Sequence, residues 1–125
     1  MLPENLQRQK ILYRFRGPGE KGCRPKAKLM LLCNPHNPTG RVWTKKELEK
    51  ISEICLRNNV IVVSDEIHCD LVHPGHTHIP FASLGRQFLE NSVTCTAPSK
   101  TFNLAGLQVA NIFAYNPDIR KKIDK

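Results

Sequence analysis

Three short polar clusters of the sequence carry side chains that can do chemistry, and each follows a run of apolar residues. The first is Cys33–Arg41, which reads CNPHNPTGR and contains Asn37. The second reads SDEIH and contains Asp65, and the third reads APSKT and contains Lys100. Together the three clusters offer an amide, a carboxylate and a primary amine.

These three groups match the needs of an aromatic aldehyde cofactor built on a pyridine ring. A lysine amine such as that of Lys100 can form a Schiff base with the aldehyde. A carboxylate such as Asp65 keeps the ring nitrogen protonated, so that the ring can act as an electron sink. An amide such as Asn37 can donate to the ring hydroxyl, and the Ser99 hydroxyl can reach a phosphate. The residues alone leave other roles open, because an Asp at a strand end also serves as a cap or a salt-bridge partner.

The apolar runs before the first two clusters predict strands of a parallel sheet. Leu29–Leu32 and Val60–Val63 are continuous apolar runs, which is typical of strands buried on both faces. Between them, Thr44 and Glu47 form the T-x-x-E pattern of a capping box at the start of a helix. A strand, a helix and a second strand within about 35 residues predict a right-handed βαβ unit with parallel strands.

The remaining elements extend this α/β pattern, a mostly parallel sheet with flanking helices. Ligands of such sheets bind beyond the carboxyl ends of the strands, so the three polar clusters are expected to converge at one edge. We expect no internal repeat. The other expected elements are a hydrophobic staple of Trp43 with Leu48, a helix end near 57–59, a helical piece over Phe81–Leu89, strands over Ser92–Thr96 and Val109–Tyr115, and a terminal helix opened by Pro117.

The N-terminal part has a different composition, and the chain divides into 1–26 and 27–125. Residues 1–30 carry eight Lys or Arg against two Asp or Glu, so most of the net charge of +8 lies there. Because the basic excess does not extend over the rest of the chain, a nucleic-acid partner is not favoured. No apolar run has the length of a membrane span. Within 1–26, Leu6, Ile11, Leu12 and Phe15 suit a short amphipathic helix, and GPGEKGCRPK over Gly17–Lys26 suits a linker.

The cysteines and histidines favour structural roles over a metal centre. The five cysteines, Cys23, Cys33, Cys55, Cys69 and Cys95, form no CxxC pair. Scattered cysteines in apolar surroundings are typical of reduced thiols in a cytoplasmic protein. The histidines at 68, 73, 76 and 78 lack the spacing of a helical metal site, so solvated loop residues are favoured and no metal is expected.

Three motifs in register resemble one enzyme family. The stretches NPHNPTGRVW, SDEIHCDL and APSKTFNLAGL are similar to the large domain of fold-type-I pyridoxal-phosphate enzymes, the class I/II aminotransferase superfamily. NPHNP with GRVW, DEIH and APSKTFN resembles the cystathionine β-lyase and C–S lyase branch of that family. The resemblance covers 27–125 and implies an incomplete, central part of the large domain, whereas 1–26 does not match.

The resemblance implies a role for each candidate residue. Lys100 would form the Schiff base with pyridoxal 5′-phosphate and later move the proton at the substrate α-carbon. Asp65 would pair with the pyridinium nitrogen, and Asn37 would hydrogen-bond the ring hydroxyl. Ser99 would contact the phosphate. His68 stands where many relatives have a Tyr that touches the ring hydroxyl, or it caps backbone groups.

Two positions depart from the family pattern. Gln108 stands eight residues after the lysine, where many relatives have an Arg that binds the phosphate. Ala97 stands where Ser or Thr is common. These departures leave the phosphate ligands open. The resemblance also implies a cis peptide bond at Asn37–Pro38.

The function that the resemblance implies is cleavage of a C–S bond in a cysteine S-conjugate such as cystathionine, giving a thiol, pyruvate and ammonia. Transamination is the alternative within the family, and a catalytically inactive fragment is the alternative outside it. The resemblance also implies homodimers among full-length family members and an amino-acid substrate, and no membrane partner is expected. Four strands with two or three helices leave apolar surface uncovered, so we expect the isolated chain to be marginally stable or prone to aggregation.

Overall fold

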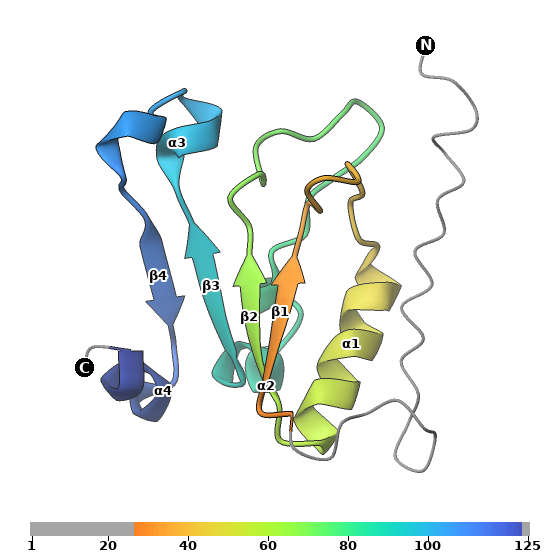
Figure 1. Cartoon of the computed structure of the whole chain (residues 1–125). Helices are drawn as coiled ribbons and strands as arrows, with labels where there is room; N and C mark the ends of the chain where they lie inside the picture. The colour runs from red at the N-terminus through yellow and green to blue at the C-terminus, as the bar shows by residue number, and fades with distance from the viewer. Residues whose placement is uncertain (1–26, 124–125) are drawn as a thin grey trace.

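The computed structural model describes residues 27–123, which form one four-stranded sheet with helices packed against it (Figure 1). The strand order is β1-β2-β3-β4, in which the first three strands are parallel and β4 is antiparallel to β3. This is the mostly parallel α/β sheet that the sequence predicts. The elements in chain order are β1 (Leu29–Cys33), α1 (Lys45–Arg57), β2 (Ile61–Asp65), η2 (Phe81–Ser83), α2 (Arg86–Glu90), β3 (Ser92–Thr96), α3 (Pro98–Thr101), η3 (Ala105–Leu107), β4 (Asn111–Ala114) and α4 (Pro117–Ile123).

The register of the sheet brings the ends of three strands to the same edge. Cys33 of β1 pairs with Asp65 of β2, which in turn pairs with Cys95 of β3. Figure 1 shows the arrowheads of these three strands at the same end of the sheet, with α3 following that of β3. Strand β4 runs the other way, so its N-terminal end, at Asn111, lies near this edge.

Helix α1 begins as its sequence predicts, with a capping box. The Glu47 N–H donates to Thr44 Oγ1 at 3.4 Å, and the Thr44 N–H donates to Glu47 Oε2 at 3.0 Å. Glu47 also forms an ion pair with Arg41. Partial burial acts to raise the pKa of Glu47, but the hydrogen bonds from Thr44 and the charge of Arg41 outweigh it, so that pKa is lowered. Trp43 and Leu48, the two residues of the expected staple, are both buried.

The core lies between the sheet and the three helical elements α1, η2 and α2, all on the same face. Leu48 and Ile51 of α1 are 0% and 1% exposed, and burial of each contributes about 1.5–3 kcal/mol. Phe81 of η2 and Phe88 of α2 complete the cluster against Leu32 and other strand residues. Because one helix and two short segments build this core, a single face of the sheet is covered.

The opposite face keeps large apolar side chains exposed. Leu31 of β1 is 81% exposed, and Leu29 and Ile112 are more than half exposed. In β1 the exposed Leu29 and Leu31 alternate with the more buried Met30 and Leu32, as the period of two in a strand requires, whereas both neighbours of Ile112 in β4 are exposed. The expectation that apolar surface is left uncovered therefore holds for the described residues. In that same part of the chain, no helix has the length and apolar character needed to cross a membrane.

Three predicted boundaries are wrong. Strand β2 continues to Asp65, because residues 64 and 65 still pair with both neighbouring strands. The predicted helical piece over 81–89 is two short segments, since Gly85 between them has extended rather than helical backbone angles (φ 156°, ψ 159°). The fourth strand, Asn111–Ala114, is shorter than 109–115, because Asn111 already pairs with Thr96, the last residue of β3, and the pairing ends at Ala114. The helix and linker expected within 1–26 lie outside the described residues.

Candidate functional site

The loop after β1 is anchored by Asn34, which is completely buried. Its backbone N–H donates to the Asp65 carbonyl at 2.9 Å, and its side-chain Nδ2 donates to the Ile79 carbonyl at 3.3 Å. Its Oδ1 accepts from the Trp43 N–H at 3.2 Å. Asn34 therefore joins the loop to the end of β2 through its backbone N–H and to the segment before η2 through its side-chain amide.

The tip of this loop presents Asn37 to solvent. The His36 N–H donates to the Arg41 carbonyl at 2.7 Å, and the Gly40 N–H donates to the His36 carbonyl at 2.8 Å. Gly40 has φ 67°, a left-handed conformation that favours glycine. The peptide bond Asn37–Pro38 is cis, which confirms the expectation from the family resemblance, and the bond before Pro35 is cis as well. Asn37 is thus exposed on a tightly hydrogen-bonded turn.

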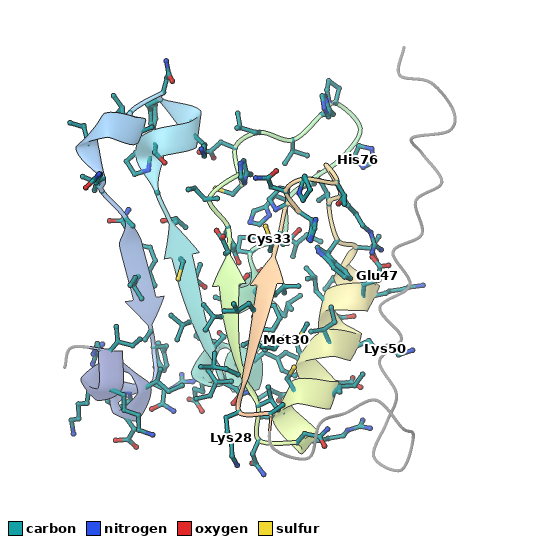
Figure 2. All side chains as sticks on the ribbon, viewed as in Figure 1. Lys28, Met30, Cys33, Glu47, Lys50 and His76 are labelled. Atoms are coloured by element: carbon teal, nitrogen blue, oxygen red, sulfur yellow. The ribbon has the colours of Figure 1, made fainter. Side chains whose placement is uncertain are left out.

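The carboxylate of Asp65 stands at the last residue of β2 and is exposed. Its Oδ1 accepts from the Ile67 N–H at 3.2 Å, which orients the side chain by a local turn. In the register of the sheet, Asp65 lies between Cys33 and Cys95. Burial, followed by the charges of Asp65 and Glu66, raises the pKa of the Cys95 thiol. Figure 2 shows Cys33 at this same end of the sheet.

Glu66, the next residue, points to the opposite side and is 3% exposed. Its Oε1 accepts from the Ser64 hydroxyl at 2.8 Å and from the Phe81 N–H at 2.9 Å. Its Oε2 accepts from His78 Nε2 at 3.0 Å. The Glu66 N–H donates to the Cys95 carbonyl at 2.8 Å. The residue beside Asp65 is therefore fixed by side-chain and backbone bonds to three other segments.

His68 lies in the turn that follows β2 and is half-buried. Its carbonyl accepts from the Leu71 N–H at 2.9 Å. Its ring Nδ1 is buried without a hydrogen-bond partner among the described residues. A buried polar atom of this kind is costly unless another group satisfies it, so a ligand could bond to His68; Nδ1 of His78 is buried without a partner in the same way.

Lys100 and Ser99 lie on α3, a single turn directly after β3. Lys100 is exposed, whereas Ser99 is half-buried. Ala97 occupies the N-cap position of α3 and forms no side-chain cap, since its methyl group cannot accept a hydrogen bond. The Thr101 hydroxyl donates to Asp70 Oδ2 at 2.7 Å, which links α3 to the turn after β2.

The arrangement gathers an amine, a carboxylate, an amide and an imidazole at the carboxyl ends of three neighbouring parallel strands. Their donor set fits a pyridoxal cofactor, because an amine matches its aldehyde, a carboxylate its ring nitrogen and an amide its ring oxygen. The orphaned Nδ1 of His68 is a further group that a ligand could satisfy. In the described part of the chain, no three His, Cys, Asp or Glu side chains are grouped to hold a metal ion.

Several residues that hold this edge together had no signal of their own in the sequence. Glu66 is adjacent to Asp65, and only the pleat of β2 and the position of η2 bury it. Asn34 lies in the quoted loop, yet nothing in its spacing distinguishes an anchoring amide from an exposed one. Their contacts are also distant in sequence: His78 is 12 residues from Glu66, and Thr101 is 31 residues from Asp70.

Comparison with known proteins places the chain in a family. Residues 7–125 match the family Aminotransferase class I and II, so the chain belongs to this family. The match begins at residue 7, within the segment that we expected to fall outside the resemblance, and the division at residue 27 stays a prediction.

Three individual relatives show what the chain is similar to, and one of them is named a lyase. The chain is 56% identical to cystathionine beta-lyase PatB of Bacillus subtilis (strain 168) over 98 residues, which are 78% of this chain and 25% of PatB. It is 45% identical to protein MalY of Escherichia coli (strain K12) over 84 residues, which are 67% of this chain and 21% of MalY. The crystal structure of cystalysin from Treponema denticola, which contains a pyridoxal 5′-phosphate cofactor, superimposes with a TM-score of 0.73 at 52% identity, over 75% of this chain and 24% of that one. The chain thus spans about a quarter of the length of these relatives.

Proposed function

We propose that this chain carries the pyridoxal 5′-phosphate-binding edge of a C–S β-lyase, with Lys100 as its Schiff-base lysine. The observation that carries the proposal is the placement of Asn37, Asp65 and Lys100 after the carboxyl ends of β1, β2 and β3, which are adjacent and parallel. This is the position at which open α/β sheets bind ligands. The pyridoxal-phosphate cofactor of cystalysin supports the choice of ligand.

Each residue then has a task that suits its chemistry. The cofactor, when bound, supplies the electron sink that stabilises negative charge at the substrate α-carbon. The Lys100 amine holds the aldehyde carbon and, once released, accepts the proton of the α-carbon. The Asp65 carboxylate keeps the ring nitrogen protonated, and the Asn37 amide donates to the ring oxygen. His68 is a second donor to that oxygen, which would satisfy its orphaned Nδ1.

Phosphate binding would be weaker than in relatives that use an arginine. Ser99, half-buried on α3, supplies one hydroxyl donor. Gln108 is exposed and neutral, so it adds no positive charge, and Ala97 adds no donor. Because Lys100 and Asp65 are exposed, water screens their charges, and it competes for the hydrogen bonds of the exposed Asn37 amide. We therefore expect the chain by itself to bind the cofactor weakly.

The reaction that we propose is β-elimination from a cysteine S-conjugate. The α-proton passes to Lys100, the C–S bond breaks, and the thiolate leaves and takes up a proton. Hydrolysis of the remaining enamine gives pyruvate and ammonia. The name of PatB, cystathionine beta-lyase, supports this reaction and a cystathionine-like substrate. Homodimer formation and a cytoplasmic location remain predictions of the same proposal.

Transamination is the second candidate, because the family is named for it and proton removal by the same lysine begins both reactions. An inactive chain is the third, since the chain spans a quarter of PatB and the remaining length would supply further contacts to substrate and phosphate.

The decisive experiment is to trap the Schiff base. The purified chain is mixed with pyridoxal 5′-phosphate, reduced with borohydride and mapped by mass spectrometry. The proposal predicts an adduct on Lys100 in preference to exposed lysines such as Lys121, and its loss in Lys100→Arg. An adduct spread evenly over the exposed lysines would refute specific cofactor binding.

A second assay separates the reactions. The cofactor-loaded chain is given cystathionine, and thiol and pyruvate are measured against amino-group transfer to a keto acid. Thiol and pyruvate in equal amounts support the lyase, and transfer without thiol supports the transaminase. A Lys100 adduct without either product supports the inactive chain.

A further inference from the structure

Helix α3 carries Lys100, yet little of its own structure fixes its position. None of its residues is buried, and its N-cap makes no side-chain hydrogen bond. Its backbone bonds, Phe102 N–H to the Pro98 carbonyl at 2.9 Å and Leu104 N–H to the Ser99 carbonyl at 3.0 Å, are local. A single turn with no fully buried residue and no side-chain cap is marginal by itself.

One side-chain contact connects this turn to a distant part of the chain. The Thr101 hydroxyl donates to Asp70 Oδ2 at 2.7 Å, across 31 residues of sequence. Within residues 27–123 it is the one side-chain hydrogen bond between α3 and another segment. A short bond to a carboxylate is among the stronger hydrogen bonds that a hydroxyl makes.

The other end of this contact is firmly held. Asp70 lies in the turn after β2, where the Cys69 N–H donates to the Glu66 carbonyl and the Leu71 N–H to the His68 carbonyl, each at 2.9 Å. Glu66 is in turn buried and bonded to three donors. Asp70 is thus attached to the same rigid segment that carries Asp65 and His68.

We propose that Asp70 and Thr101 form a positioning pair, which holds the Lys100 turn in place relative to the turn after β2. This inference rests on the proposed function, because the pair sets the relation between Lys100 and Asp65, the two groups that would contact opposite parts of one ring. Neither Thr101 nor Asp70 contacts the cofactor in this scheme. The pair reduces the disorder of α3 before binding, so that less ordering free energy is lost when the ligand binds.

The test compares three variants of one hydrogen bond, two at its donor and one at its acceptor. Thr101→Val removes the donor at nearly constant shape, Thr101→Ser keeps it, and Asp70→Asn removes the charge of the acceptor. Thr77→Val, at an exposed threonine of the connection after β2, is the matched control. Hydrogen–deuterium exchange of the cofactor-free chain is measured over 98–104, and the dissociation constant of pyridoxal 5′-phosphate is measured by absorbance.

We expect Thr101→Val to speed exchange over 98–104 and to weaken cofactor binding, each about threefold to tenfold, the effect of one hydrogen bond. Thr101→Ser and Thr77→Val should stay within about twofold of the parent. The double variant with Asp70→Asn should be no worse than the more affected single variant, because the two groups share one interaction. The unfolding midpoint should change little, since the contact is near the surface.

Two results would overturn the inference. Unchanged exchange in Thr101→Val would mean that the bond does not hold α3, and faster exchange with unchanged cofactor affinity would mean that it does not prepare the site. The exchange measurement needs no cofactor. If the parent chain forms no Lys100 adduct, the proposed function fails, while faster exchange that Thr101→Ser restores would still support the role of the pair in holding α3.

Discussion

The buried carboxylate of Glu66 allows a sharp prediction about stability. Glu66→Ala removes the acceptor of three donors, Ser64 Oγ, the Phe81 N–H and His78 Nε2, at 2.8–3.0 Å. Phe81 is 0% exposed, so water cannot replace the lost acceptor of its N–H. An unsatisfied buried donor costs about 1–3 kcal/mol, and breaking a buried charged network costs about 3–5 kcal/mol in all.

A loss of about 3–5 kcal/mol is a large part of the 5–15 kcal/mol that is typical of a domain. The assay is urea unfolding followed by the fluorescence of Trp43, the one tryptophan of the sequence, which is buried in the core. Glu66→Gln keeps an oxygen acceptor and should lose less, about 1–2 kcal/mol.

The matched control is Glu90→Ala, which removes an exposed carboxylate whose ion pair with Arg86 lies on the surface of α2. Surface pairs contribute about 0–1 kcal/mol, so the control should unfold near the parent. If Glu66→Ala also unfolds within about 0.5 kcal/mol of the parent, the hydrogen bonds to Glu66 do not stabilise this edge, and the reasoning is refuted.

Three further predictions test other parts of the structure. Asp65→Asn should speed alkylation of Cys95 by about twofold or more at pH 8, because it removes a charge that raises the thiol pKa. The control is Asp118→Asn, which changes a distant carboxylate. Equal alkylation rates in the two variants would contradict the register of β2 and β3. The pKa of Glu47 is lowered, so its contribution to stability is present at neutral pH and is lost as the pH falls below about 5. In Glu47→Gln, the midpoint of thermal unfolding should therefore fall less steeply as the pH is lowered. An unchanged dependence of the midpoint on pH would argue against the capping box. Leu31→Glu should reduce light scattering by the chain at increasing concentration, because Leu31 is 81% exposed on the uncovered face; scattering that stays the same would locate the self-association elsewhere.

Much of the fold was predictable because its signals are local. The apolar runs of β1 and β2 predicted strands of a parallel sheet, although Leu29 and Leu31 of β1 are exposed on the uncovered face instead of buried. The capping box of α1 depends on residues three positions apart. The rule that parallel strands end at one edge was enough to place Asn37, Asp65 and Lys100 together. Their chemical roles came from the family resemblance and remain predictions.

The tertiary structure decided what depends on contacts between distant segments. Sequence pattern alone did not indicate that β4 is antiparallel, because strand direction depends on how the connection through η3 returns to the sheet. Nor did it distinguish Asp65 from Glu66: the two carboxylates are adjacent, and only the pleat and the packing of η2 expose one and bury the other. The bond between Thr101 and Asp70 spans 31 residues, so it exists only once the ends of β2 and β3 lie side by side. The sequence by itself determined which chemical groups reach this edge of the sheet, and the fold decided which of them are held in place, since long-range hydrogen bonds form only where packing brings their partners together.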